Sequence, residues 1–108
     1  MWNKPTDKQL AKLPVFYSRE HVALKDKLIQ MHFFLTSSDW YVVEYDADSR
    51  NFFGFVILNN DYEMAEWGYF SLDELMGLKS GYIEVDRDLH FKPKKASEVG
   101  SISKAQRF

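Results

Sequence analysis

Three polar side chains near the C-terminal third of the chain alternate in a pattern that could bind a divalent cation. Asp86, Asp88 and His90 would lie on one face of an extended segment. Two carboxylates and an imidazole are ligands that divalent metals accept. The same alternation is typical of the polar side of a surface strand, where Arg87 and Lys92 would form ion pairs, and we favour that interpretation. A small metal-assisted hydrolase or nuclease that uses the three residues is therefore the alternative function, and no resident cofactor is expected.

A second set of side chains could exchange protons with a substrate. Glu44, Asp46 and Asp48 are possible acids or bases. Their partner would be His32 or His90, because such catalysis needs two titratable groups with separated pKa values. The sequence contains no serine-nucleophile elbow, no glycine-rich phosphate loop and no His-Glu-x-x-His segment, and without cysteine it cannot supply a thiol nucleophile or a thiolate zinc site. No motif favours an enzyme, and no catalytic residue is assigned.

Acidic residues concentrate in the middle of the chain. Residues 39–88 hold twelve Asp/Glu and three Lys/Arg and carry a formal charge of -9, whereas residues 1–38 and 89–108 carry +3 and +4. Such a stretch can be the solvated side of a sheet, or it can bind a partner protein that has a basic surface. The second interpretation predicts a non-enzymatic protein-binding factor. Its binding residues would be Glu44, Asp46, Asp48, Asp61, Glu63, Glu66, Asp73 and Glu74.

The C-terminal end is basic and poor in apolar residues. Residues 1–93 are expected to form a single domain, and residues 94–108 a mobile tail. Clustered cations bind phosphate backbones, so weak, salt-sensitive nucleic-acid binding through this tail is a third possibility. Elsewhere the acidic middle would repel phosphate, which makes nucleic acid an unlikely partner for the rest of the chain. The cations concerned are Lys92, Lys94, Lys95, Lys104 and Arg107.

The elements that would position these groups are centred on a β-hairpin. Residues 40–45 and 52–58 are rich in aromatic and β-branched side chains, and the polar residues between them favour a turn. In the first strand, Glu44 and Asp46 fall on one face, which we expect to be the solvated one. The second strand is apolar on both faces, as in a covered central strand. Gly54 within it indicates a bulge or an aromatic ring laid across the gap.

Capping boxes signal two helices around this hairpin. One begins at Thr6 and is stopped by Pro14, and the other begins at Ser71 and covers about residues 71–78. The expected fold class is α+β, a single domain with an antiparallel sheet of about four to five strands around the central hairpin. The second helix would pack on the sheet and the short N-terminal helix at its edge. Further strands are expected over residues 28–35, 66–70, 82–85 and 89–91.

Nothing in the sequence indicates a membrane protein. No run approaches the ~20 apolar residues that a bilayer-spanning helix needs. The first residues also lack the continuous apolar region of a secretion signal. We therefore expect no membrane association and a cytoplasmic location.

A series of ordered motifs runs through the chain: Trp40-Tyr41, Glu44-Tyr45, Phe53-Gly54, Gly68-Tyr69-Phe70-Ser71-Leu72, Glu74-Leu75 and Asp86-Arg87-Asp88-Leu89-His90-Phe91-Lys92-Pro93. Together they are similar to the family known as domain of unknown function 2958, over roughly residues 10–95, with Asp86 at a position where Glu is usual. The resemblance implies an accessory protein of plasmids and other mobile elements, and it supplies no catalytic residues. With the acidic stretch, it suggests an anti-defence role, in which the protein occludes the basic surface of a host defence nuclease.

Overall fold

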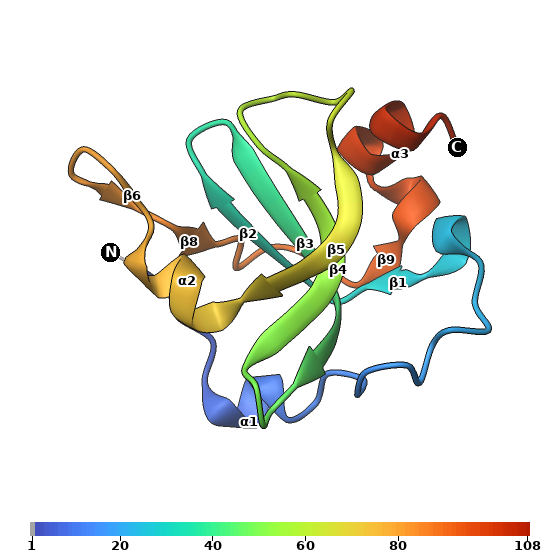
Figure 1. Cartoon of the computed structure of the whole chain (residues 1–108), viewed down its shortest axis with the longest axis horizontal. Coiled ribbons are helices and arrows are strands. Elements are labelled where there is room, and N and C mark those ends of the chain that lie inside the picture. Colours follow the sequence, from blue (N-terminus) through green and yellow to red (C-terminus); the bar gives the residue numbers. More distant parts are fainter. Residues whose placement is uncertain (1) are drawn as a thin grey trace.

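A five-stranded antiparallel sheet forms the centre of the computed structural model, which describes residues 2–108 (Figure 1). The two strands of the expected hairpin, β3 and β4, lie inside this sheet, and β3 is its middle strand. The expected α+β fold with an antiparallel sheet of four to five strands is confirmed. The order across the sheet is β5 (Glu66–Ser71), β4 (Asn51–Ile57), β3 (Ser38–Asp46), β2 (Met31–Leu35) and β8 (Asp86–Arg87).

The β3–β4 hairpin contains one irregularity, a register shift between Val42 and Glu44. Gly54 of β4 pairs with Val42 beside this bulge. A β-carbon at position 54 would overlap the carbonyl oxygen of Tyr41, so the close approach of the two strands requires glycine there. Of the two possibilities that Gly54 raises in the sequence, a bulge or an aromatic ring across the gap, the structure shows a bulge, and it lies in the neighbouring strand β3.

The bulge reverses the alternation of side chains along β3. Trp40 and Val42 before it and Tyr45 after it belong to the same core cluster. Glu44 therefore points to the opposite face, and it is only 5% exposed. The expectation that Glu44 lies with Asp46 on a solvated face is wrong, because residues 15–19 cover the face to which the bulge turns Glu44.

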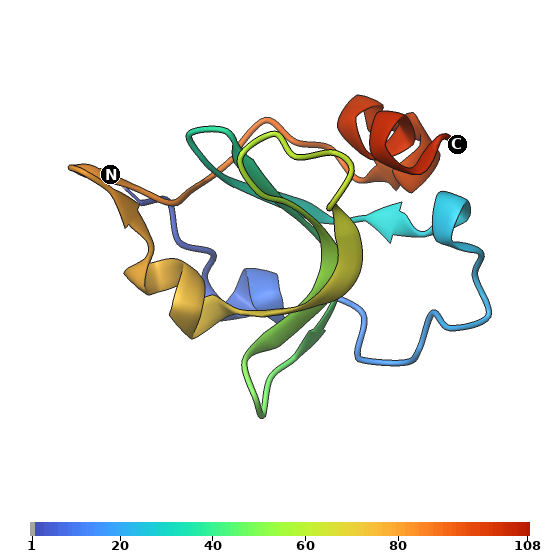
Figure 2. The same ribbon diagram turned by 45° about the horizontal axis from the view of Figure 1, so that its top comes forward.

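Both faces of the sheet are covered, and the sheet curls strongly between the two covering layers (Figure 2). We call the side that carries α1 (Asp7–Leu10) and α2 (Leu72–Gly77) the α2 face. Ser71 caps α2 by accepting a hydrogen bond from the Glu74 N–H, and the Thr6 capping box begins α1, so both expected helices are confirmed in shortened form. The buried core of this face comprises Leu10, Phe33, Leu35, Trp40, Val42, Tyr45, Phe52, Phe70, Leu72, Leu75 and Val85.

The C-terminal segment covers the other side of the sheet, the α3 face. It consists of β9 (Lys94–Lys95), the 3-10 turn η2 (Ala96–Glu98) and α3 (Gly100–Gln106). Ala96, Val99 and Ile102 are buried on this face, so the mobile tail expected from residue 94 is wrong. These apolar residues recur every third position and form one stripe facing the sheet. The strands contribute the remaining buried residues of this core, which are Ile29, Tyr41, Val43, Phe55 and Ile57.

The expected strand 28–35 is divided in two. Residues 28 and 29 form β1 (Leu28–Ile29), which pairs with β9 in a separate two-stranded sheet, and β2 begins at Met31. Ile29 consequently packs in the α3-face core, whereas Phe33 and Leu35 pack in the α2-face core. A short 3-10 turn, η1 (Leu24–Asp26), precedes β1.

The segment after α2 forms a small hairpin and then joins the sheet edge. Strands β6 (Lys79–Ser80) and β7 (Ile83–Glu84) are connected through Gly81, whose φ of 63° is the left-handed region that glycine tolerates. The strand expected over 82–85 is thus shorter, and the strand expected over 89–91 is wrong, since residues 89–90 form a turn. Among the helices described within residues 2–108, none has the length and apolar character needed to cross a membrane.

Candidate binding groove

The eight acidic residues expected to bind a partner do not form one continuous surface. Asp46 pairs with Asn51 at one end of β4, and Glu66 pairs with Val56 near the other end. Five residues of strand separate these positions, roughly 17 Å at ~3.3 Å per residue. The structure therefore divides the exposed carboxylates into two groups. One contains Asp46, Asp48, Asp73 and Glu74, and the other contains Asp61, Glu63 and Glu66.

Glu44 belongs to neither group, because its carboxylate is buried in a structural role. Its Oε1 accepts a hydrogen bond of 3.2 Å from the Tyr17 N–H, and its Oε2 accepts one of 3.0 Å from the Arg19 N–H. Two backbone donors of the 15–19 loop are thereby satisfied, so Glu44 holds this loop against the α3 side of the sheet.

The group around the hairpin tip is partly engaged with neighbouring residues. The Asp46 carboxylate accepts hydrogen bonds from the Ser49 hydroxyl and N–H, and these bonds lower the pKa of Asp46. Asp73 forms an ion pair of 2.9 Å with Arg50, which brings one positive charge among the carboxylates. Two of the four acids at this end, Asp46 and Asp73, are therefore engaged within the protein.

The residues of the suggested metal site point in different directions. Asp86 accepts hydrogen bonds from the Asn3 N–H and Nδ2, and Asp88 accepts one from the His90 N–H. Burial raises the pKa of Asp86, but hydrogen bonds from Asn3 and Arg87 outweigh it, so the net shift is downward. Because β8 ends at Arg87, the extended segment that would align these ligands does not continue. Within residues 2–108, no three His, Asp or Glu side chains lie close enough to hold a metal ion.

His32 lies between the carboxylates of Asp39 and Asp88. Its Nε2 is 2.7 Å from Asp39 Oδ1, and its Nδ1 is 3.5 Å from Asp88 Oδ2. The imidazole stacks on Tyr41 at a centroid distance of 4.5 Å, and the Tyr41 hydroxyl is 2.7 Å from Ser101 Oγ on α3. Burial raises the pKa of Tyr41 to about 12. The acids considered beside His32 in the sequence are not its neighbours, and this cluster joins β2, β3 and the C-terminal segment.

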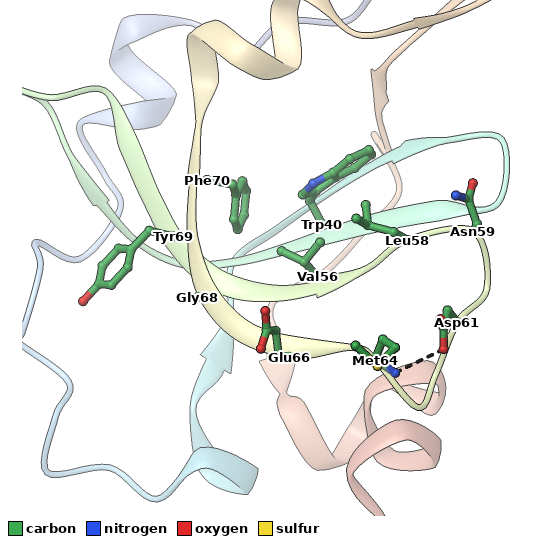
Figure 3. A pocket seen from close by; sticks show the side chains of 10 residues that line it. All are labelled: Trp40, Val56, Leu58, Asn59, Asp61, Met64, Glu66, Gly68, Tyr69 and Phe70. Carbon is green, nitrogen blue, oxygen red and sulfur yellow. Dashed lines mark hydrogen bonds between the residues drawn. The ribbon is translucent and has the colours of Figure 1, made fainter.

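A groove of about 570 Å³ lies on the α2 face, beside edge strand β5 (Figure 3). Trp40 and Phe70 form its buried apolar wall, with Val56 between them. Leu58 is 52% exposed and Met64 76% exposed, so both present apolar surface to solvent at the open end of the groove. Apolar area of this kind gains free energy when a partner covers it, about 25 cal/mol per Å².

Two carboxylates stand at the rim of this groove. Asp61 lies in the loop between β4 and β5 and accepts a hydrogen bond of 3.1 Å from the Met64 N–H, which shapes that loop. Glu66 is the first residue of β5 and is exposed. No lysine, arginine or histidine is among the residues that line the groove. The rim therefore favours a ligand that combines an apolar group with a positive charge.

Gly68 keeps the groove open at its β5 side. It pairs with Gly54 across the sheet, and neither residue has a side chain to fill the space between Trp40 and Phe70. A β-carbon at position 68 would meet no atom within 4 Å. The close approach of two backbones requires glycine at position 54. Position 68 borders open space instead, so the absence of a side chain at Gly68 determines the shape of the groove surface.

Sequence reasoning identified the rim but not the apolar lining. Asp61 and Glu66 were expected among the partner-binding residues, whereas Trp40, Leu58 and Met64 were not. Leu58 and Met64 flank a polar loop, and unpaired apolar residues beside such a loop are a usable signal of an exposed patch. That Trp40 joins them depends on where the β4–β5 loop and β5 lie relative to the predicted hairpin, which spacing along the chain does not reveal.

The basic C-terminal residues lie on the layer that covers the α3 face. Lys104 on α3 places its Nζ 4.8 Å from the centre of the Tyr62 ring, and Lys94 lies 5.4 Å from that of Phe91. Their stems are thus held against aromatic rings in an ordered layer. Lys92, Lys94, Lys95, Lys104 and Arg107 are all exposed.

The fold and the groove define a small α+β domain with an apolar, acid-rimmed groove next to edge strand β5. The chain belongs to the family described as proteins of unknown function, DUF2958, whose model matches residues 6–104. This match confirms the resemblance seen in the sequence, and it includes most of the C-terminal layer. Searches of curated proteins and of solved structures give no match.

Proposed function

We propose that this protein is a non-enzymatic accessory factor that binds a partner protein through the groove between Trp40 and Met64. The observation that carries the proposal is the combination of exposed apolar surface with the Asp61 and Glu66 carboxylates at its rim. Protein interfaces commonly have an apolar centre and a polar rim. The partner would offer an apolar side chain for the groove and lysine or arginine for the rim.

The acidic group at the tip of the β3–β4 hairpin would contribute less to binding than the group beside the groove. Asp73 is paired with Arg50, and Asp46 is engaged with Ser49, so their charges are partly used within the protein. Asp61, Glu63 and Glu66 have no ion pair among the described residues, and all three are exposed. The group beside the groove is therefore the better source of electrostatic attraction for a basic partner.

In its finer form, the proposal is an accessory of a mobile element that inhibits a host defence nuclease. The support is indirect, because it comes from the family resemblance and from the acidic stretch. A nuclease presents a cationic channel to its substrate, and an acidic, apolar-centred surface is complementary to such a channel. The mechanism would be occlusion of that channel, with no chemical step.

Paired charge reversals test this proposal. The double variant Asp61→Lys/Glu66→Lys reverses the groove rim, and Asp46→Lys/Asp48→Lys reverses the same number of charges at the far end of the hairpin. Tagged wild type and both variants would be used to capture partners from a host lysate. Any protein enriched by wild type would then be purified and titrated against all three by calorimetry.

The rim variant should weaken binding of the purified partner at least about tenfold, since two rim charges become repulsive. The far-end variant should retain wild-type affinity within about threefold, and both variants should keep the wild-type thermal midpoint within a few degrees. Equal loss of affinity in the two variants would show that only net charge matters. Unchanged affinity in the rim variant would remove the groove as the interface.

A further inference from the structure

Strand β5 is an open edge of the main sheet. It pairs with β4 on one side and has no strand neighbour on the other among residues 2–108. Within the part of the chain that the structure describes, no backbone–backbone hydrogen bond outside the sheet ladders involves residues 66–70. Half of the N–H and C=O groups of an edge strand point away from the sheet, so β5 presents unpaired donors and acceptors in a row.

This edge lacks the usual features that prevent strand addition. Its sequence, Glu66–Ser71, contains no lysine and no proline, and its pairing with β4 runs without a register shift. The opposite edge, β8, has only two residues and includes Arg87. Of the two edges, β5 is therefore the one whose length and composition permit another strand to pair.

The edge and the groove are parts of the same surface. Glu66, Gly68 and Phe70 alternate with Trp67 and Tyr69 along β5, and the first three border the groove. In Figure 3 the Tyr69 side chain points away from the groove, to the other side of the sheet. A strand added beside β5 would place every second side chain on the groove side, directly over the opening that Gly68 leaves.

We propose that β5 and the groove bind an extended segment of the partner protein as a sixth, antiparallel strand, with an apolar residue opposite Gly68 and a lysine or arginine opposite Glu66. This inference rests on the proposed function and adds the conformation and the sequence pattern of the bound segment. Main-chain hydrogen bonds to β5 supply affinity, and the groove and rim select the side chains. Directly opposed residues have β-carbons ~5 Å apart, which brings the cation within reach of Glu66.

The register predicts a short recognition pattern. An antiparallel segment that reads Leu-Thr-Leu-Thr-Lys would face, in that order, Phe70, Tyr69, Gly68, Trp67 and Glu66. The two leucines and the lysine lie on the groove side, and the threonines lie on the Trp67 side. The central leucine enters the space that no side chain of the protein occupies at Gly68.

Peptides with blocked backbone amides provide the decisive test. The probe is a nine-residue peptide that contains Leu-Thr-Leu-Thr-Lys at its centre, with acetylated and amidated ends, titrated into the full chain by calorimetry. One derivative carries N-methyl groups on the two leucines and the lysine, and a second carries them on the two threonines and one flanking residue. Only one of these alternating sets of amides can face β5 in a paired strand.

Strand pairing predicts that one N-methylated peptide binds at least about tenfold more weakly than the probe while the other stays within about threefold. Replacing the probe lysine by glutamate should weaken binding at least about fivefold, through repulsion by Glu66 and Asp61. Equal behaviour of the two N-methylated peptides would overturn strand pairing. A probe that fails to bind at millimolar concentration would overturn it as well.

Gly68→Leu tests the groove side of the same proposal. The new side chain would enter open space, so the protein should stay folded while the peptide loses its site. Gly77→Leu, in α2 with equally open surroundings, is the matched control and should bind the probe as wild type does. Wild-type affinity in the Gly68 variant would overturn the proposal.

Two further results separate the possible occupants and the two proposals. A concentration-dependent dimer in sedimentation experiments, abolished by Gly68→Leu, would assign the edge to a second copy of this chain and overturn a peptide occupant. If partner binding depends on Asp61 and Glu66 but the two N-methylated peptides bind with equal affinity, the proposed function is retained and only the added strand is removed. Loss of that charge dependence, by contrast, would remove the proposed function itself.

Discussion

The two faces of the sheet are covered in different ways. The α2 face is covered by helices that capping boxes predict in the sequence, yet this face keeps an open groove of about 570 Å³. The α3 face is covered by a segment with a weak sequence signal, yet Ala96, Val99 and Ile102 pack closely against it. The strength of a local helix signal thus says little about how completely a helix covers a sheet, because coverage depends on where the connection places it.

Ile102→Asp is the most severe way to break this comparison. Ile102 is fully buried on the α3 face, and an unpaired carboxylate there should destabilise the protein by about 4 kcal/mol or more. Urea unfolding followed by tryptophan fluorescence measures the loss. Arg107→Gln at the exposed C-terminal end of α3 is the control and should change stability by less than about 0.5 kcal/mol. A stable Ile102 variant would mean that the C-terminal layer is dispensable, as a mobile tail would be.

A pair of glycine substitutions sharpens the comparison within the α2 face. Gly54→Ala should destabilise the protein by about 1–3 kcal/mol or more, because the new methyl group meets the Tyr41 carbonyl. Gly68→Ala, its cross-strand partner, should be neutral or slightly stabilising, since the methyl group enters open space and alanine restricts the unfolded chain. Thermal unfolding of both proteins provides the measurement. Similar losses in both would contradict the assignment of the groove to the Gly68 side.

Exchanging acids for amides compares a buried carboxylate with an exposed one. Glu44→Gln should lower the free energy of unfolding by about 1.5–3 kcal/mol. The reason is that one of the two backbone N–H groups that donate to Glu44, that of Tyr17 or that of Arg19, would face an NH₂ group. Asp46→Asn at the hairpin tip should leave the unfolding midpoint within error of wild type. Chemical denaturation of the two variants decides the matter. Equal stabilities would show that Glu44 does not hold the 15–19 loop.

The smallest expected effect concerns pH and the α3 face. The folded-state pKa of Tyr41 is raised to about 12, mainly by burial, so folding favours its neutral form. Its contribution to stability is complete below pH 10 and should be lost as the pH rises from 10 towards 12. Denaturation midpoints across this range, with tyrosinate absorbance at 295 nm, measure it. Tyr41→Phe should show a shallower decline than wild type, and an identical decline would contradict the assignment.

Much of the fold was predictable because it depends on local chemistry. The hairpin, the capped helix after Ser71 and the bulge signalled by Gly54 all follow from residue types and short spacings. The position of Glu44 was not predictable, because the bulge lies in β3 while its signal lies in β4. The bulge turns Glu44 to the α3 side of the sheet, and the 15–19 loop then buries its carboxylate there.

The candidate site was predictable only in part. Asp61 and Glu66 were expected from the charge of the middle segment, but their separation from Asp46 and Asp48 depends on the length of β4 between them. Charge along a sequence adds up whatever the fold, whereas a surface requires the charges to converge in space. The apolar lining also combines Trp40 of β3 with Met64 of the β4–β5 loop, two residues that are far apart in the sequence.

The sequence by itself determined the α+β class, the central hairpin, the family and the acidic character of the middle segment. Those properties depend on amino-acid composition, on the alternation of apolar and polar residues, and on motifs formed by residues close together in the chain. Only the tertiary structure decided that residues 94–106 cover a face of the sheet, that the acids form two groups, and that β5 lies open beside a groove. The physical reason is that burial and edge exposure are set by strand order, and strand order arises from pairings between residues far apart in the chain.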